Sequence, residues 1–112
     1  MNTIKNRVQL IGNLGNDPEI KQFDGGKTRA SFRMATSDVY KNDKGEKITE
    51  TQWHNIVAWN GVAKIADKYM KKGSQVAIDG KLTSRSWDDK DGNKRYITEV
   101  VASEILLLDK KE

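Results

Sequence analysis

Residues 51–73 read TQWHNIVAWNGVAKIADKYMKKG, and the spacing of the apolar side chains changes once within this stretch. Its first part belongs to a predicted strand over residues 49–59, which is rich in Thr, Trp, Ile and Val. The next apolar residues recur with the spacing of one helix face, and they are Val62, Ile65, Ala66 and Tyr69. Asn60 is the expected N-cap of this short helix, and Gly73 stands where a left-handed residue is favoured after it.

Four further strands are predicted outside this stretch, at residues 6–14, 27–36, 74–87 and 94–108. The first three alternate between apolar and polar side chains, as half-buried strands do. Their apolar faces consist of Val8, Leu10, Gly12 and Leu14, then Ala30, Phe32 and Met34, then Val76, Ile78, Gly80 and Leu82. Turn residues at 16–18 and 24–26 and polar hairpin tips at 41–47 and 88–93 separate the elements.

The order of elements is therefore three strands, one helix and two strands. Most connections are hairpins, so the sheet is expected to be mainly antiparallel. One helix cannot cover both faces of a five-stranded sheet. The economical solution is an all-β, five-stranded OB-fold barrel with extended hairpins and the helix at one end. An open five-stranded sheet with one helix is the alternative. We expect one domain over residues 1–108 and a short C-terminal remnant at 109–112.

The composition limits the classes of function. The chain has 112 residues, 20 Lys plus Arg, 16 Asp plus Glu, no Cys and a formal net charge of +4. This length fits a single domain. Without Cys, the chain has no disulfide scaffold, thiol nucleophile or thiolate zinc site. The mild basic excess is spread along the chain, so a site for a polyanion would have to be assembled by folding.

The sequence contains no constellation typical of an enzyme. Gly80-Lys81 lacks the Ser or Thr that must follow in a P-loop. The run Asp89-Lys90-Asp91-Gly92 fails as a calcium loop, because Trp and Thr stand where that loop needs carboxylates. His54 has no carboxylate within two residues along the chain to orient it as a general base. We therefore expect a binding protein without catalytic residues, metal or cofactor.

Aromatic side chains stand where a core does not require them. Trp53 and Trp59 lie six residues apart on one predicted strand and so point to the same face. Trp87 ends a strand on its polar side, beside Arg85, and Tyr40 adjoins a basic hairpin tip. Flat side chains next to cations are typical of surfaces that stack nucleic-acid bases and hold phosphates. The alternative interpretation is ordinary sheet packing for Trp53 and Trp59, and aromatic residues at hairpin edges for Trp87 and Tyr40.

Several segments, in the same order along the chain, resemble the bacterial single-stranded DNA-binding proteins of the replication type, an OB-fold family. These segments are VQLIGNLGNDPE at 8–19, ATS at 35–37, TQWH at 51–54, KGSQV at 72–76, IDGKL at 78–82 and YITEV at 96–100. The resemblance implies that the protein binds and protects single-stranded DNA without sequence preference. It also implies a role in DNA replication, recombination and repair, and a homotetramer.

The resemblance further implies roles for single residues. Four aromatic residues match the base-stacking positions of the family: Tyr40, Trp53, Trp59 and Trp87. Three basic residues match positions near the DNA path: Arg7, Lys72 and Arg85. His54 matches a residue of the subunit interface. Asn55 and Thr83 stand where some members carry Arg, so phosphate contacts there would be absent or moved.

The last predicted strand gives an independent reason to expect an oligomer. It ends in the apolar run Ile105-Leu106-Leu107-Leu108. Consecutive residues of a strand point to opposite faces, and a barrel interior can bury only one of the two sets. The other set needs a partner, for which a second copy of the chain is the usual solution. His54 lies on the face opposite Trp53 and would then sit between subunits.

The two ends of the chain carry further expectations. Members of this family usually continue into a flexible tail with an acidic tip that recruits replication and repair partners. This chain stops at Leu108-Asp109-Lys110-Lys111-Glu112, so tail-mediated recruitment is not supported. The N-terminus has no apolar signal-peptide core, and no segment approaches a membrane span. We expect a cytoplasmic, nucleoid-associated protein without a membrane partner.

One other class of partner stays open at this point. An OB-type module that binds RNA or another protein would show the same aromatic and basic pattern, because nothing in the sequence reads the 2′-hydroxyl.

Overall fold

The computed structural model describes residues 4–108. A short 3-10 helix, η1 (Ile4–Asn6), precedes the first strand. The elements that follow are β1 (Val8–Leu14), β2 (Glu19–Phe23), β3 (Lys27–Lys41), β4 (Lys47–Trp59), α1 (Asn60–Tyr69), β5 (Gln75–Asp88) and β6 (Lys94–Leu107). No helix within residues 4–108 is long and apolar enough to cross a membrane.

Five of the six strands close into a barrel. The sheet order is β1-β5-β6-β4-β3-β2, and β1 also pairs with β3 through Asn13–Ala35 and Leu14–Met34, which closes the sheet on itself. The β4–β6 pairing is parallel and short, from Ile56–Val100 to Ala58–Ala102, and the other pairings are antiparallel. The predicted OB-fold barrel is confirmed, and the open sheet is excluded.

The strand β2 is absent from the prediction. It lies between the two predicted turns at 16–18 and 24–26, and among residues 4–108 it pairs only with β3. Ile20 is the one β2 side chain that packs against the core, and the other four are exposed. A strand that buries a single side chain gives little periodic signal. β2 is therefore an added edge strand beside the five-stranded barrel.

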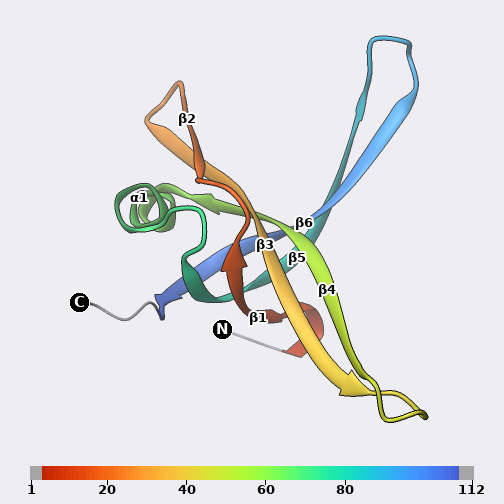
Figure 1. Cartoon of the computed structure of the whole chain (residues 1–112). Helices are drawn as coiled ribbons and strands as arrows, with labels where there is room; N and C mark the ends of the chain where they lie inside the picture. The colour runs from red at the N-terminus through yellow and green to blue at the C-terminus, as the bar shows by residue number, and fades with distance from the viewer. Residues whose placement is uncertain (1–3, 109–112) are drawn as a thin grey trace.

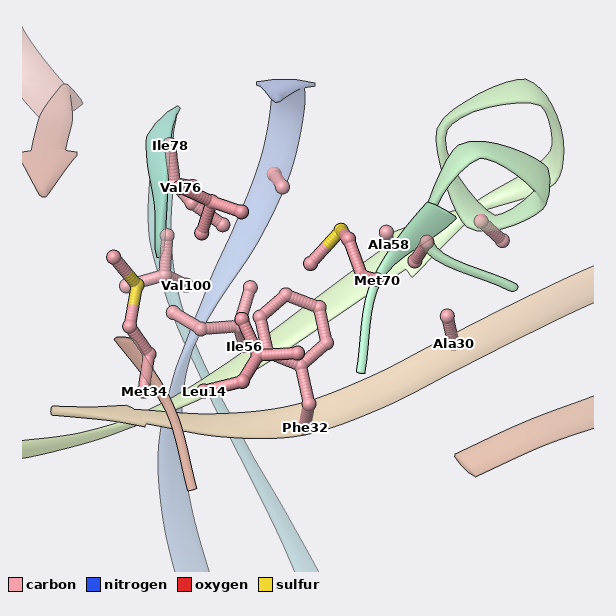
Figure 2. Packing of buried hydrophobic residues seen from close by; sticks show 13 residues of the cluster. Leu14, Ala30, Phe32, Met34, Ile56, Ala58, Met70, Val76, Ile78 and Val100 are labelled. Atoms are coloured by element: carbon pink, nitrogen blue, oxygen red, sulfur yellow. The ribbon is translucent and has the colours of Figure 1, made fainter. Parts of the chain in front are cut away.

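The core is a small cluster at the centre of the barrel. Every barrel strand supplies at least one buried side chain, among them Leu14, Phe32, Ile56, Val76 and Val100. Figure 2 shows these side chains directed toward one another from their different strands. The predicted inward faces of the first two of these strands are thus confirmed, because all of their apolar side chains lie in or against this cluster and Gly12 is buried.

Two long hairpins project from the barrel, as Figure 1 shows: β3–β4 and β5–β6. The prediction that Leu82 faces the core is wrong. No residue of β5 after Gly80 is buried, and Leu82 is exposed. Apolar and polar side chains still alternate beyond Gly80, where β5 leaves the barrel. In that part of the strand the alternation does not correspond to burial. The part of the β5–β6 hairpin that follows Gly80 and projects from the barrel is called the β5–β6 arm below.

The helix α1 meets the barrel with smaller residues than predicted. Ala63 and Ala66 are fully buried against it, whereas Ile65 and Tyr69 are exposed. Alanine allows a close approach of the helix to β3 and β4, and that approach turns Ile65 and Tyr69 away from the core. The buried face is therefore shifted from the predicted one.

The predicted helix caps are also partly wrong. Asn60 is the first helical residue, with φ 54°, and Trp59 holds the N-cap position without a side-chain cap. The Asn60 Oδ1 instead accepts the backbone N–H of Thr28 at 3.3 Å. Gly73 does have a left-handed φ of 92°, but α1 ends at Tyr69, so Gly73 shapes the following turn. Its N–H donates to the Leu14 carbonyl at 2.9 Å.

Candidate nucleic-acid interface

One face of the β3–β4 hairpin carries two of the predicted stacking residues. Side chains directly opposite each other in an antiparallel pair lie on the same face of the sheet. The facing pairs on this side are Ala35–Trp53, Arg33–Asn55, Ser31–Val57 and Arg29–Trp59. Trp53 and Trp59 are both exposed, whereas Ile56 and Ala58 point inward and are fully buried. The prediction that the two indoles share one face is confirmed, and the structure shows that this is the outer face.

A groove of about 450 Å³ crosses this face and reaches the β5–β6 arm. Its walls carry three arginines, which are Arg29, Arg33 and Arg85, and three acids, which are Asp17, Glu19 and Glu99. Asn55 also lines the groove, and Thr83 pairs with Glu99 across the arm. A phosphodiester strand laid along the groove would therefore meet guanidinium groups whose neighbours are both aromatic and acidic.

Trp53 is held in place from two sides. The Cζ of Arg33 lies 4.6 Å from the centroid of its ring. A Cβ atom at residue 15 would overlap the six-membered ring of Trp53, so any larger residue there would displace the indole from this position. The N–H of Gly15 donates to the Arg33 carbonyl at 2.8 Å, which ties both supports together. The indole is thus positioned before any ligand binds, with much of its surface still in solvent.

Trp59 belongs to a second aromatic group at the other end of the same face. The rings of Trp59 and Phe23 have their centroids 5.9 Å apart and are tilted by 36°. The Cζ of Arg29 lies 5.2 Å from the centroid of the Phe23 ring. Both rings are more than one-third exposed, which leaves surface for a further flat group.

Trp87 stands on the β5–β6 arm beside Arg85, as predicted. The Cζ of Arg85 lies 5.4 Å from the centroid of the Trp87 ring. Arg85 also donates from Nε to Oε1 of Glu99 at 3.0 Å. Because Arg85 and Glu99 both line the groove, the arm continues the aromatic and cationic surface beyond the barrel.

Tyr40 is not on the same face as Trp53. It lies opposite Ile48 in the β3–β4 ladder, and this pair alternates with the pairs that hold the two tryptophans. Tyr40 is exposed near the hairpin tip. It therefore shares the side of His54, and a strand that touched both Tyr40 and Trp53 would have to pass around the hairpin.

The other two predicted basic residues lie in different places. The backbone N–H of Lys72 donates to Oδ1 of Asp17 at 2.8 Å, so Lys72 adjoins one end of the groove. Arg7 does not line the groove. It donates to Asp79 through Nε at 3.2 Å and Nη2 at 2.6 Å, on the β1–β5 side of the barrel.

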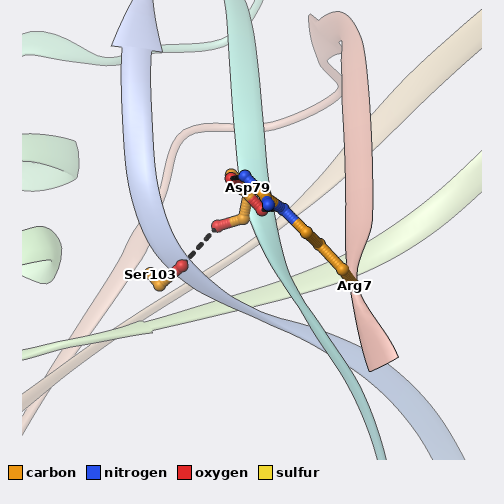
Figure 3. Close-up of polar contacts among 3 residues, drawn as sticks. All are labelled: Arg7, Asp79 and Ser103. Carbon is orange, nitrogen blue, oxygen red and sulfur yellow. Dashed lines mark hydrogen bonds and ion pairs between the residues drawn. The ribbon is translucent and has the colours of Figure 1, made fainter. Parts of the chain in front are cut away.

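Asp79 is thereby bound on both its side chain and its backbone. Figure 3 shows Arg7 reaching its carboxylate while the hydroxyl of Ser103 donates to its carbonyl at 2.9 Å. The hydrogen bonds from Arg7 hold the pKa of the Asp79 carboxyl below its usual range, and the pKa of Arg7 is raised in turn. This pair is a structural ion pair away from the groove.

His54 faces the opposite side from Trp53, as the alternation predicts. Its Nε2 and the Oγ1 of Thr36 are 3.0 Å apart and form a hydrogen bond. Thr36 in turn packs close to Gly12 of β1. The partly buried imidazole therefore lies near the first strand. Within residues 4–108, no group of three or more His, Cys, Asp and Glu could hold a metal ion.

Sequence reasoning missed Arg29, Arg33 and Phe23 as candidate site residues. Arg29 and Arg33 alternate with Ala30, Phe32 and Met34 in the predicted strand at 27–36, so the sequence marks them only as members of its polar side. The polar hairpin tip at 41–47 could have indicated that they lie beside the tryptophans. Counting residues back along both strands from this tip pairs Arg33 with Asn55 and Arg29 with Trp59. Phe23 could not be found in this way, since its strand was not predicted.

The sequence pattern of the Single-strand binding protein family matches residues 5–108 of this chain. Single-stranded DNA-binding protein 1 of Xylella fastidiosa is 46% identical over 108 residues, which is 96% of this chain and 79% of the relative. Single-stranded DNA-binding protein 1 of Chlorobaculum tepidum is also 46% identical over 108 residues, which is 96% of this chain and 67% of that relative.

Two solved structures share the fold. A Plasmodium falciparum SSB in complex with ssDNA superposes with a TM-score of 0.83 at 34% identity, covering 97% of this chain and all of the other. A deletion mutant of the single-stranded DNA binding protein from Thermus aquaticus superposes with a TM-score of 0.80 at 27% identity. It covers 93% of this chain and 50% of the other.

Proposed function

Since the chain belongs to the single-strand binding protein family, we propose that it binds single-stranded DNA by stacking bases on Trp53, Trp59, Trp87 and Tyr40. The observation that carries this mechanism is the shared face of Trp53 and Trp59 beside a groove lined by three arginines. Aromatic platforms with cations along a groove are the usual means of holding an unpaired strand. Membership in a family of binding proteins confirms that the protein is not an enzyme.

The arginines and Lys72 contact phosphates in this proposal. Arg33 and Arg85 each lie against an aromatic ring, so a phosphate held by one of them would bring its base next to Trp53 or Trp87. Lys72 adds a cation at the end of the groove. Arg7 is committed to Asp79, and a phosphate contact from it would be made with a guanidinium that already has an anionic partner.

The binding is expected to be independent of base sequence. Every base offers a π-face to an indole, and phosphates are the same at each position. Binding of this kind would protect exposed single strands during DNA replication, recombination and repair. Its place of action would be the cytoplasm, in association with the nucleoid.

We further propose that the protein acts as a homotetramer. The outer face of β1, β5 and β6 carries an apolar row formed by Ile11, Ala77 and Leu106, which are neighbours in the two strand ladders. Ile11 and Leu106 are 62% and 61% exposed, and a shallow cavity of about 520 Å³ lies on this row. Ile105 packs against the core, so the last strand does present apolar side chains to both faces.

His54 is assigned to the subunit interface in this proposal. It lies near β1, and within residues 4–108 the strand β1 pairs with β3 only at Asn13 and Leu14. One edge of β1 before Asn13 is therefore available to a second copy. The number of four subunits comes from the family resemblance and not from these contacts.

Fluorescence titration of the three tryptophans tests the binding proposal. Oligo-dT added to the protein should quench the emission strongly, because stacked indoles are quenched by bases. Unlabelled poly-U and duplex DNA are then added as competitors to the preformed complex. An emission that oligo-dT leaves unchanged would overturn the stacking mechanism. Displacement by poly-U or duplex as effective as by oligo-dT would overturn the assignment to single-stranded DNA.

A further inference from the structure

We propose that the β2–β3 hairpin carries an additional nucleotide subsite, in which Phe23 stacks a base and Arg29 with Lys21 holds its phosphate. This inference rests on the proposed function, because the ligand is the next nucleotide of a strand already bound at Trp59. It adds Phe23, Arg29 and Lys21, none of which is among the DNA-binding residues predicted from the sequence. The subsite is called the Phe23 subsite below.

The strand register places the Phe23 subsite on the groove face. Lys21 lies opposite Arg29 in the β2–β3 ladder, and Arg29 lies opposite Trp59 in the β3–β4 ladder. Directly paired residues share a face, so Lys21, Arg29 and Trp59 form one row across three strands. Phe23 is two residues beyond Lys21 on the same side of β2, and it pairs with Lys27. The tryptophan face therefore continues onto the added strand β2.

The two rings at this point leave room for a ligand. Phe23 and Trp59 are 36% and 37% exposed, although they contact each other with centroids 5.9 Å apart. A cavity of about 490 Å³ opens beside them, with Asp24, Lys27 and Asn60 on its walls. This volume lies in the range of about 300–1,000 Å³ that is usual for small-ligand pockets. A base can stack on the open side of either ring while its edge reaches the polar walls.

The cations of the subsite lack an anion of their own. Two of them lie on the Phe23 ring, since Lys21 Nζ and Arg29 Cζ are each 5.2 Å from its centroid. None of the ion pairs within residues 4–108 includes Arg29. The Nε of Arg29 is buried without a hydrogen-bond partner. A guanidinium with a buried N–H group that lacks a hydrogen-bond partner is stabilised when an anion binds to its other N–H groups.

Arg29 links the new subsite to the groove. It lines the groove on one side and contacts Phe23 on the other. A DNA strand that leaves Trp59 toward β2 meets Arg29 first and then Lys21, with the Phe23 ring beside both cations. Two cations beside an exposed ring suit one nucleotide, because the cations can hold its phosphate while the ring stacks its base. The path of the DNA is thereby lengthened over the edge strand.

The helix α1 supplies a matched control for this geometry. Lys68 Nζ lies 5.3 Å from the centroid of the Tyr69 ring, and Tyr69 is exposed. The pair repeats the contact between Lys21 and Phe23 but is on a helix, outside the strand ladders that hold Arg29 and Trp59. Tyr69 therefore measures the binding that a cation beside an exposed ring gives without this row.

Photocrosslinking of the unmodified protein tests the stacking of a base on Phe23. An oligo-dT with 5-iodouracil in place of thymine is bound and irradiated, and the protein is then cut after Lys and Arg. Residues 22–27 form one fragment whose single aromatic residue is Phe23, and Tyr69 lies in another, at 69–71. We expect crosslinks on 22–27, as well as on the fragments that hold the tryptophans, and none on 69–71. Crosslinks on the tryptophan fragments with none on 22–27 would overturn the subsite.

Substitutions test its contribution to binding. Phe23→Ala should weaken oligo-dT binding about five-fold or more, as expected for one lost stacked base. Phe23→Tyr, which keeps a flat ring, should restore the affinity, and Tyr69→Ala should have no effect. Arg29→Gln should reduce the slope of log affinity against log salt by about 0.7, the value for one phosphate of a single strand. Lys68→Gln should leave the slope unchanged.

The outcomes separate this proposal from the proposed function. If Trp53→Ala weakens binding and Phe23→Ala does not, the groove binds DNA and the Phe23 subsite is wrong. If neither variant changes the affinity, the stacking mechanism itself fails. Circular dichroism verifies that each variant is folded. If Phe23→Ala proves unfolded, Phe23→Leu retains an apolar side chain without a flat ring, and the crosslinking result decides the matter independently.

Discussion

Arg85 donates its Nε–H to Glu99 at 3.0 Å across the β5–β6 arm, and the Glu99 side chain is only 11% exposed. A nearly buried acid therefore stands within a groove assigned to a polyanion. One of the cations expected to hold phosphate is already balanced by it. The charge that DNA meets in this groove is consequently lower than a count of arginines indicates.

Replacement of this acid should strengthen DNA binding. In Glu99→Gln, the amide oxygen can still accept the Nε–H of Arg85, while the negative charge that opposes phosphates is removed. We expect a tighter complex at low salt and a slope of log affinity against log salt that steepens by about 0.7. Fluorescence titration at several salt concentrations measures both. Weaker binding would mean that the carboxylate is needed to orient Arg85.

Removal of single indoles should weaken the complex in a position-dependent way. Trp53→Ala and Trp87→Ala should each cost about 1–3 kcal/mol of binding free energy, the range known for alanine substitutions in single-strand binding proteins, a class that includes this family. Tyr96 provides the control, because it is exposed on the other face of the β5–β6 arm from Trp87.

Labelled oligo-dT followed by anisotropy gives these affinities without relying on tryptophan emission. Tyr96→Ala should bind as the unchanged protein does. If both tryptophan variants did so as well, the indoles would have a structural role only.

Binding should fall with salt and should be far weaker for duplex DNA. Each phosphate neutralised by Lys or Arg releases counterions, with a log–log slope near −0.7 per phosphate for single strands. Stacking on the exposed rings adds a component that does not depend on charge, so moderate salt should weaken the complex without abolishing it. Titrations over a salt series with oligo-dT and with the matching duplex measure this. A salt-independent affinity would contradict the groove assignment.

The ion pair between Arg7 and Asp79 predicts a dependence on pH. The pKa of Asp79 is lowered chiefly by the hydrogen bond from Arg7. A carboxyl whose folded-state pKa is depressed stabilises the fold above its ordinary pKa of about 3.9, and the contribution disappears as the pH falls through the lowered value. Arg7→Gln should therefore reduce stability at neutral pH and bring the Asp79 titration up toward its ordinary range.

NMR titration of the Asp79 carboxyl carbon checks this shift. Asp89 serves as an internal reference, because its lowered pKa depends first on the Asn93 N–H and then on Arg95. Its titration should be the same in both proteins. An unchanged Asp79 midpoint in the variant would show that Arg7 does not cause the depression.

Light scattering should report an oligomer for the unchanged protein. Ile11→Glu places a charge in the exposed apolar row of β1, β5 and β6, and His54→Lys places one beside Thr36. Both changes should shift the mass toward smaller species. A monomeric unchanged protein would refute the assembly proposal, whereas an intact oligomer in His54→Lys alone would refute only the role given to His54.

The parts of the fold that were predictable are those where burial on one side repeats along a strand. Phe32, Met34 and Ile56 follow such patterns, and all three lie in the core. The pattern carries no information where an element buries one residue, as in β2, or where it leaves the barrel, as at Leu82. Both failures have the same physical cause. Apolar side chains alternate with polar ones to match burial only where one side of the strand faces the barrel interior.

The candidate site was predictable to a similar extent. The common face of Trp53 and Trp59 follows from their spacing alone. The position of Arg33 beside Trp53 depends on the register between strands, which the hairpin tip fixes. The ion pair of Glu99 with Arg85 joins two residues from different strands, and the contact of Phe23 with Trp59 depends on a strand that burial hardly marks. Contacts of this kind arise from tertiary structure.

The parallel contact between β4 and β6 determines when the chain can finish folding. Ile56 and Ala58 gain their neighbours Val100 and Ala102 only after more than forty further residues have been made. At about 5–20 residues per second, a nascent chain carries the uncovered side of β4 for roughly 2–9 seconds. Throughout that interval an unpaired strand edge is exposed, so a translation that stops before residue 100 leaves a fragment prone to aggregation. The barrel closes only when β6 has been made.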